Sequence, residues 1–275
     1  MSKCYRIVVL GSTGMLGYAL GRYFDSLPNY EAYLSYRDPK LGYGKNNFQF
    51  DAVEYVQRKD GFLFNGFDYV INCIGGIKQH GLSDNDLSML NTIFPIHLSV
   101  ECSMTNTRLI HVSTDCVFSG KKGTYLESDV PDPVDMYGIT KLIGEPTSHM
   151  VLRTSLIGEE LHTNVSLLGW AKSQAGKSVR GFTNHIWNGV TTTQFARCCD
   201  EIITKDLYVP GLRHIFNPTP VSKAEMLEEF NSHFDLGLKI EHVDAEVSVN
   251  RTLATQHTLC QQLSVPDFRA MVATM

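Results

Sequence analysis

A short apolar segment near the start of the chain runs directly into a glycine-rich turn and then into a helical pattern. Residues 6–10 (RIVVL) are typical of a buried strand, and Gly11, Gly14 and Gly17 follow in the spacing GxxGxxG. Strand, glycine turn and helix in this order are typical of a unit that binds a dinucleotide. The first glycine permits the tight turn, the second lets the backbone approach a pyrophosphate, and the third lets the helix pack against the strand. A turn without a ligand is the alternative, and the complete strand–turn–helix order favours binding.

The turn and the ends of the next strands supply the residues expected to line a dinucleotide. Arg37 follows a strand over residues 30–36, where an arginine accommodates a 2′-phosphate and favours NADPH, while Asp38 directly after it keeps NADH as the alternative. Asp51 ends a short strand over residues 47–50 and would either meet the adenine amino group or cap the next helix. A strand starting at residue 67 ends in small residues that suit a backbone passing close to a cofactor. The predicted contacts are Gly11, Ser12, Thr13, Gly14, Met15, Leu16, Gly17, Arg37, Asp51, Cys73, Ile74 and Gly75.

The strands alternate with helical stretches at residues 17–24, 52–59 and 87–104. Such alternation predicts an α/β fold, a doubly wound parallel sheet of the Rossmann type with helices on both faces.

Composition excludes several other classes of protein. The chain has 275 residues, a net charge of -5 and 43% hydrophobic residues, which is ordinary for a soluble globular protein and argues against a nucleic-acid-binding protein. The ten histidines show no HxxxH or HExxH spacing, so no metal site is predicted. Seven cysteines without a CxxC pair indicate reduced thiols in a cytoplasmic protein. No apolar run approaches ~18 residues, so no membrane span is expected.

Tyr137 and Lys141 stand four residues apart, which places both side chains on one face of a helix. An ammonium near a phenol lowers the tyrosine pKa and makes the phenol a proton donor or acceptor near neutral pH. An incidental pair on a surface helix is the alternative. Ser113 and Thr114 end a strand over residues 108–112, where ligands bind in open α/β sheets, so their hydroxyls would meet a substrate oxygen. By themselves these hydroxyls are also typical of a simple turn.

Taken together, these motifs resemble the extended short-chain dehydrogenases/reductases, in particular dTDP-4-dehydrorhamnose reductase and related nucleotide-sugar reductases. The resemblance covers about residues 5–270. The stretches that carry it, besides the glycine turn, are NCIG at 72–75, LNTIFP at 90–95, STDCVFSG at 113–120, YGITKLIGE at 137–145, LRTS at 152–155, NGVTTT at 188–193 and PDFR at 266–269.

The resemblance implies hydride transfer from NADPH, or NADH, to the keto group of a nucleotide-activated deoxysugar used for surface polysaccharide. Tyr137 would protonate the carbonyl oxygen, and Thr114, with Ser113, would hydrogen-bond it. Lys141 would bind the nicotinamide ribose and lower the pKa of Tyr137. Asn91 falls where the family places an asparagine near the cofactor, with a helix-start cap as the alternative. Ser113, Tyr137 and Lys141 would also contact the cofactor.

Two residues depart from the family pattern. Related 4,6-dehydratases carry Thr-Asp-Glu and use the two carboxyl groups as acid and base, whereas Asp115 is followed here by Cys116, which favours reduction over dehydration. The reductases usually have tyrosine at that position. Leu156 stands where an aromatic residue that stacks on the sugar is typical, so the sugar specificity is expected to differ.

In this family, the second half of the chain builds a smaller C-terminal substrate-binding lobe. The implied division is a dinucleotide-binding domain over residues 1–155, completed by about 188–215, and a lobe over 156–187 and 216–275. Arg180 and Trp187 belong to residues 180–188, which combine a cation, two aromatics and amides and so suit the base and phosphates of a nucleotide sugar, with a loop that packs its own aromatics as the alternative. The capping-box pattern at residues 222–225 indicates a helix start and no chemistry. The predicted substrate contacts are Ser113, Asp115, Cys116, Phe118, Arg180, Trp187, Asn188 and Arg251. Arg251 would pair with a diphosphate, with a solvated surface arginine as the alternative.

Two other functions use the same fold. A nucleotide-sugar epimerase would keep its cofactor bound and turn over without net redox change. A non-catalytic nucleotide-binding regulatory subunit, such as that of a methionine adenosyltransferase, would need no tuned phenol, so Tyr137, Lys141 and Thr114 argue against it. A homodimer is a further expectation.

Overall fold

The computed structural model describes residues 3–58, 62–77, 81–161 and 165–275. Its main element is a seven-stranded sheet in the order β11-β6-β5-β4-β1-β2-β3, in which every neighbouring pair is parallel. The strands are β1 (Tyr5–Leu10), β2 (Tyr30–Tyr36), β3 (Asn46–Gln49), β4 (Tyr69–Asn72), β5 (Arg108–Thr114), β6 (Met150–Thr154) and β11 (Gly211–His214). The predicted Rossmann-type α/β fold is confirmed. The strand order reverses between β1 and β4, where open sheets of this kind form a ligand crevice.

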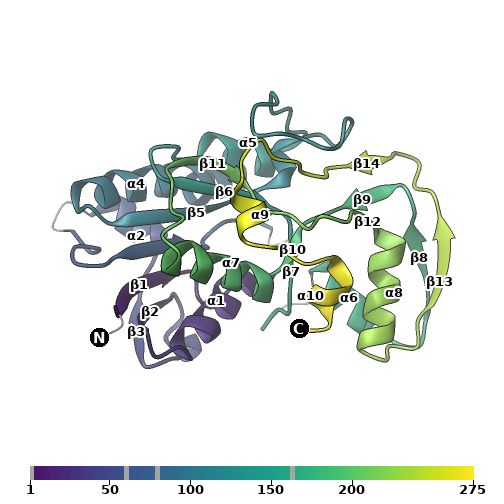
Figure 1. Ribbon diagram of the computed structural model, residues 1–275, viewed down its shortest axis with the longest axis horizontal. Coiled ribbons are helices and arrows are strands. Elements are labelled where there is room, and N and C mark those ends of the chain that lie inside the picture. Colours follow the sequence, from purple (N-terminus) through teal and green to yellow (C-terminus); the bar gives the residue numbers. More distant parts are fainter. Residues whose placement is uncertain (1–2, 59–61, 78–80, 162–164) are drawn as a thin grey trace.

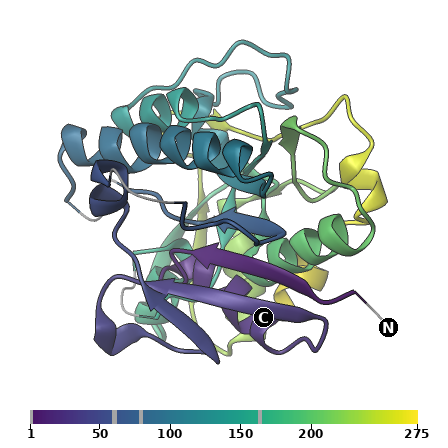
Figure 2. The ribbon, with the colours of Figure 1, turned by 90° about the vertical axis from the view of Figure 1, so that its left-hand side faces the viewer.

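Helices cover both faces of the sheet (Figures 1 and 2). One face carries α1 (Met15–Asp25) and α7 (Thr192–Thr204), and the other carries α2 (Ala52–Gln57), α3 (Asp84–Ser88), α4 (Phe94–Met104) and α5 (Met136–Ile143). Successive residues of β1 explain this, because Ile7 and Val9 enter one buried cluster while Val8 and Leu10 enter the other. The period of two in a strand sends alternate side chains to opposite faces.

The rest of the chain builds small sheets beside the main one, on the right of Figure 1. The chain here forms β7 (Leu156–Ile157), β8 (Ser178–Phe182), β9 (His185–Trp187), β10 (Val190–Thr191), β12 (Val221–Ser222), β13 (Lys239–Val243) and β14 (Val249–Asn250). Its helices are α6 (Leu167–Ser173), α8 (Lys223–His233), α9 (Leu259–Gln262) and α10 (Phe268–Val272). Met226, Phe230 and Phe268 join the same buried cluster as α1 and α7, so one core links the main sheet to the smaller part.

The helix predicted over 87–104 is interrupted. A π-helical turn, η3 (Met89–Ile93), separates α3 from α4. Pro95 lacks the N–H that would bond the carbonyl of Asn91, so that carbonyl is left to other contacts. Gly144 occupies the space beside it, since a Cβ there would overlap the Asn91 carbonyl oxygen. The helix predicted over 52–59 ends at Gln57, and residue 59 lies outside the described residues.

Candidate active site

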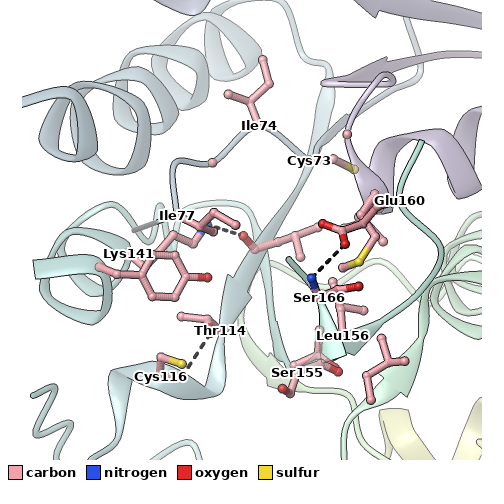
Figure 3. Close-up of a pocket in the computed structure, with 18 of the residues that line it drawn as sticks. Cys73, Ile74, Ile77, Thr114, Cys116, Lys141, Ser155, Leu156, Glu160 and Ser166 are labelled. Atoms are coloured by element: carbon pink, nitrogen blue, oxygen red, sulfur yellow. Dashed lines mark hydrogen bonds between the residues drawn. The ribbon is translucent and has the colours of Figure 1, made fainter. Parts of the chain in front are cut away.

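A cavity of about 840 Å³ opens at the carboxyl ends of the parallel strands (Figure 3). Its walls come from the turn after β1, the ends of β4, β5 and β6, and the start of α5. In Figure 3, Lys141, Thr114 and Cys116 lie on one side, and Leu156, Glu160 and Ser166 on the other. Of the predicted site residues, the cavity brings together Thr13, Gly14, Met15, Leu16, Arg37, Cys73, Ile74, Gly75, Ser113, Thr114, Asp115, Cys116, Tyr137, Lys141 and Arg251.

The three glycines of the turn differ in the space around them. Gly11 has a positive φ of 78°, a region that L side chains rarely adopt, and Gly17 lies so close to it that a Cβ would stand 2.6 Å from the Gly11 carbonyl carbon. Gly14 is different, because the nearest atom to a Cβ there would be the Gly11 oxygen at 3.5 Å. Gly11 and Gly17 are therefore required by the fold, whereas the protein leaves space above Gly14, on the cavity wall.

Tyr137 and Lys141 are both directed to the cavity by α5. The helix begins at Met136 because the Asp135 carboxylate caps it, accepting the Gly138 N–H at 2.8 Å. Lys141 is only 5% exposed, and its Nζ donates a hydrogen bond of 2.7 Å to the Val112 carbonyl at the end of β5. Burial lowers the pKa of Lys141 to about 8, against the opposing effect of Glu145.

The expectation that Lys141 lowers the pKa of Tyr137 is wrong for the protein alone. The pKa of Tyr137 is raised, first because the walls around its hydroxyl withhold water and further because Cys116 and Asp115 oppose a negative phenolate. A hydrogen bond with the Thr114 side chain acts in the opposite direction. The Lys141 ammonium is directed to a backbone carbonyl instead. Tyr137 therefore keeps its proton at neutral pH, as a proton donor requires.

Thr114 ends β5 and places its hydroxyl beside Asp115 and Cys116. The hydroxyl donates to the Asp115 carboxylate at 3.3 Å and accepts the Cys116 N–H at 3.2 Å. Burial raises the pKa of Asp115, although Arg251 and hydrogen bonds from Cys116, Thr114 and Ser155 oppose the rise. Burial, with the nearby Asp115, also raises the pKa of the Cys116 thiol to about 12. Cys116 is thus a neutral thiol at physiological pH.

Several predicted cofactor residues have structural partners. The Ser113 hydroxyl donates to Glu145 at 2.6 Å, and that of Ser12 donates to the Ser35 carbonyl at 2.6 Å. The Asp51 carboxylate caps α2 by accepting the N–H groups of residues 53 and 54, and the structure places it outside the cavity. Asn91 is neither a helix-start cap nor part of the wall, because its amide bonds both backbone groups of Gly76 and so holds the loop after β4.

Three predicted substrate residues lie outside the cavity. Phe118 is fully buried and stacks on Tyr125. Arg180 is exposed on β8, where its guanidinium lies over the Phe182 ring. Asn188 is buried and uses its amide to bond both backbone groups of Leu253. Local composition suggested these side chains, but tertiary packing assigns them to the core and to the outer surface.

A second hollow of about 290 Å³ adjoins the first and shares Asp115, Cys116 and Arg251 with it. Trp187, a predicted contact, lines this hollow, and so does Lys223, which sequence reasoning treated as structural. Burial lowers the pKa of Lys223, and the neighbouring Arg251 lowers it further. Lys223 is the first residue of α8, directly after the capping residue Ser222. The capping-box pattern predicts where this helix begins but not where the Lys223 side chain points, so the sequence did not indicate its place in the hollow. Ser155, Leu156 and Ile157 also line both hollows, and the last two form the short strand β7.

Across the described part of the chain, no cluster of three His, Cys, Asp or Glu side chains is arranged to hold a metal ion. None of the helices in that part is long and apolar enough to cross a bilayer.

Comparisons with known proteins agree on this architecture. A family model described as the RmlD substrate binding domain matches residues 5–255. The chain is 27% identical over 144 residues to methionine adenosyltransferase 2 subunit beta of Bos taurus, and 29% identical over 176 residues to a probable low-salt glycan biosynthesis reductase of Haloferax volcanii. These matches take in 51% and 59% of this chain but span only 41% and 58% of those relatives. A solved dTDP-4-dehydrorhamnose reductase of Bacillus anthracis in complex with NADP has the same fold, with a TM-score of 0.77, 20% identity and coverage of 98% and 97%.

Proposed function

We propose that this chain, which belongs to the family of the RmlD substrate binding domain, reduces the keto group of a nucleotide-activated deoxysugar with NADPH. One observation supports this most. The Tyr137 phenol, the Thr114 hydroxyl and the Lys141 ammonium share the wall of a cavity whose other wall is the glycine turn. A proton donor and a turn suited to a dinucleotide therefore line the same cavity.

The residues present fit a dinucleotide. The cavity passes Gly14, where no side chain blocks the backbone, and Arg37, whose guanidinium suits a 2′-phosphate. It continues past Cys73 and Gly75 at the end of β4, next to the point where the strand order reverses. When bound, the reduced nicotinamide supplies a hydride. Binding of NADP by a relative of the same fold supports the assignment.

The reaction then needs a proton at the carbonyl oxygen of the sugar. Tyr137 would donate it, because the raised pKa keeps its phenol protonated until the oxygen gains negative charge. Thr114, which shares a hydrogen bond with Tyr137, would hold that oxygen in place. The Lys141 ammonium would stabilise the phenolate that remains after proton transfer.

The second hollow would receive the phosphates of the substrate. Arg251 and Lys223 both line it, and a pair of cations suits a diphosphate. Water elimination is disfavoured at this site, because the Cys116 thiol, with a pKa of about 12, stands where a dehydratase has a carboxyl group.

The decisive test is NADPH oxidation against a panel of nucleotide-linked 4-keto-6-deoxysugars, with the product stereochemistry determined by NMR. Consumption with one of them supports reduction. Copurified cofactor with a changed sugar and no consumption of added NADPH would indicate an epimerase.

The match to methionine adenosyltransferase 2 subunit beta favours a second candidate, a protein that binds the cofactor without turning over a sugar. Tight NADPH binding without consumption or sugar conversion across the panel would support it.

The rate of reduction is expected to fall as the pH rises through about 8. Below this value Lys141 is an ammonium, and above it the lysine becomes neutral and no longer stabilises the Tyr137 phenolate. The raised pKa of Tyr137 keeps the phenol protonated over the same interval. A profile of kcat/KM from about pH 6 to about pH 10 measures this effect. A rate that stays flat through that range would contradict the role of Lys141.

Replacing Arg37 with Met is expected to raise the KM for NADPH roughly tenfold and to leave the KM for NADH nearly unchanged, because the 2′-phosphate loses its cation. Initial rates with both cofactors measure the change. Arg58→Met, which removes a cation outside the cavity, serves as the matched control. Equal effects on both cofactors would place the 2′-phosphate elsewhere.

A further inference from the structure

We propose that Glu145 is a positioning residue of this site, which holds the end of β5 and keeps Lys141 in its ammonium form. The inference rests on the proposed function, in which Lys141 works as a cation beside Tyr137. The sequence YGITKLIGE at 137–145 does not by itself show whether Glu145 has this role or is a solvent-exposed glutamate after the helix.

The carboxylate of Glu145 is buried among three donors. Arg153, on β6, binds it through two parallel hydrogen bonds, Nε to Oε1 and Nη2 to Oε2, each 2.7 Å long. The Ser113 hydroxyl donates a third bond of 2.6 Å to Oε1. The side chains of Arg153 and Glu145 are 3% and 6% exposed. A charge-assisted bidentate pair of this kind fixes the carboxylate in one orientation.

This arrangement holds one strand end from two directions. Val112 and Ser113 are consecutive residues of β5, and the Lys141 Nζ bonds the Val112 carbonyl at 2.7 Å. Glu145 follows Lys141 by four residues and bonds the Ser113 side chain. The two contacts hold the residues directly before Thr114, the last residue of β5. Glu145 is thus linked to Lys141 and to Thr114 without touching the cavity.

The charge of Glu145 also acts on Lys141 directly. Burial disfavours the lysine ammonium, and Glu145 offsets part of that effect on the pKa. The Cys73 thiol acts in the same direction as Glu145 but less strongly, and burial raises its own pKa to about 12. Among the described residues, the other titratable groups beside the ammonium are uncharged at neutral pH, because burial lowers the pKa of the His111 imidazole well below its usual value and raises that of the Tyr137 phenol. Arg153 carries a charge but is bound to Glu145 itself.

The test is the titration of Lys141 in the full chain, without cofactor or sugar. Competitive trace acetylation with acetic anhydride, followed at the Lys141 peptide by mass spectrometry, reports the neutral amine as a function of pH. In Glu145→Gln the titration is expected to move to lower pH, with about threefold or more extra acetylation at neutral pH. An unchanged titration in a folded Glu145→Gln protein overturns the proposal.

Two further variants separate the charge effect from simple loss of structure. Glu145→Met with Arg153→Met removes both charges and leaves none unpaired, which keeps the fold if Glu145→Gln does not. In this double variant the titration of Lys141 is expected to move to lower pH, as in Glu145→Gln. If the double variant folds and Lys141 titrates as in the wild type, the proposal is overturned. Glu101→Gln is the matched control, because this buried carboxylate on α4 bonds Tyr55 and Phe64 in the other core cluster. It should leave the Lys141 titration unchanged, and an equal movement would assign the effect to general loosening.

Sugar reduction is measured separately on the same variants. A displaced titration with no reductase activity in the wild type would overturn the proposed function and leave the role of Glu145 intact. With activity present, Glu145→Gln should move the alkaline limb of the pH–rate profile to lower pH, and Glu145→Asp should restore part of it. If Glu145→Gln lowered the rate at every pH and left the alkaline limb of the pH–rate profile in place, the role of Glu145 would be structural only.

Discussion

Replacing Tyr137 with Phe is expected to lower the rate of sugar reduction roughly 100- to 10,000-fold, the usual contribution of a positioned general acid. Phenylalanine keeps the ring and its packing on α5 but removes the hydroxyl that would protonate the carbonyl oxygen. Cofactor affinity should stay close to that of the wild type, because the glycine turn and Arg37 are untouched. Steady-state rates measure the loss, and a fluorescence titration with NADPH measures the affinity.

Tyr33→Phe is the matched control for this variant. It removes a phenol oxygen that bonds Glu31 on the main sheet, away from the cavity, and should leave turnover unchanged. If Tyr137→Phe turned over at close to the wild-type rate, Tyr137 would not be the proton donor. If both variants lost activity equally, the loss would reflect the fold and not the chemistry.

Gly17→Ala is expected to destabilise the fold by about 3 kcal/mol or more, at the upper end of the usual cost of overpacking. The added Cβ would lie 2.6 Å from the Gly11 carbonyl carbon and 2.9 Å from the Ser12 Cα. These are backbone atoms of the turn, so no side-chain rotation relieves the overlap. Urea unfolding followed by circular dichroism measures the free energy of unfolding.

Gly14→Ala is the partner experiment at the same turn. Its Cβ would meet only the Gly11 oxygen, at 3.5 Å, so stability should change little. The methyl group would enter the cavity, and NADPH affinity is expected to fall at least tenfold if the pyrophosphate passes there. Similar stability of the two variants would contradict the division of roles between Gly14 and Gly17. If Gly14→Ala bound NADPH as tightly as the wild type, the pyrophosphate would not bind at this turn.

Local pattern was sufficient to predict the sheet and its turn. The apolar run at residues 6–10 is a short-range signal, and so is the GxxGxxG spacing after it. Strands and helices are likewise recognised from the periodicity of apolar residues within each segment, which does not depend on distant parts of the chain. The interruption at η3 was missed, because it depends on Pro95 together with Gly144, the residue directly after α5, which lies against the freed carbonyl. The signal was present at Pro95, whose missing N–H always leaves one carbonyl unpaired.

The second hollow could not be predicted in the same way. Lys223 and Arg251 are far apart in sequence and share one wall only because α8 and the segment after β14 pack beside β9. The reverse holds for Phe118, Arg180 and Asn188. Their side-chain types suit a ligand, but Phe118 and Asn188 are buried in the core and Arg180 is exposed on β8, outside both hollows.

From the amino-acid order alone follow the Rossmann sheet, the glycine turn and the pairing of Tyr137 with Lys141 on one helix, because each depends on residues within a few positions of one another. The protonation of that pair was decided by tertiary structure. Burial raises the pKa of Tyr137 and lowers that of Lys141, and Glu145, fixed by Arg153 from another strand, acts against the second effect. Solvation and charge depend on everything that surrounds a group in space, and most of those neighbours are distant along the chain.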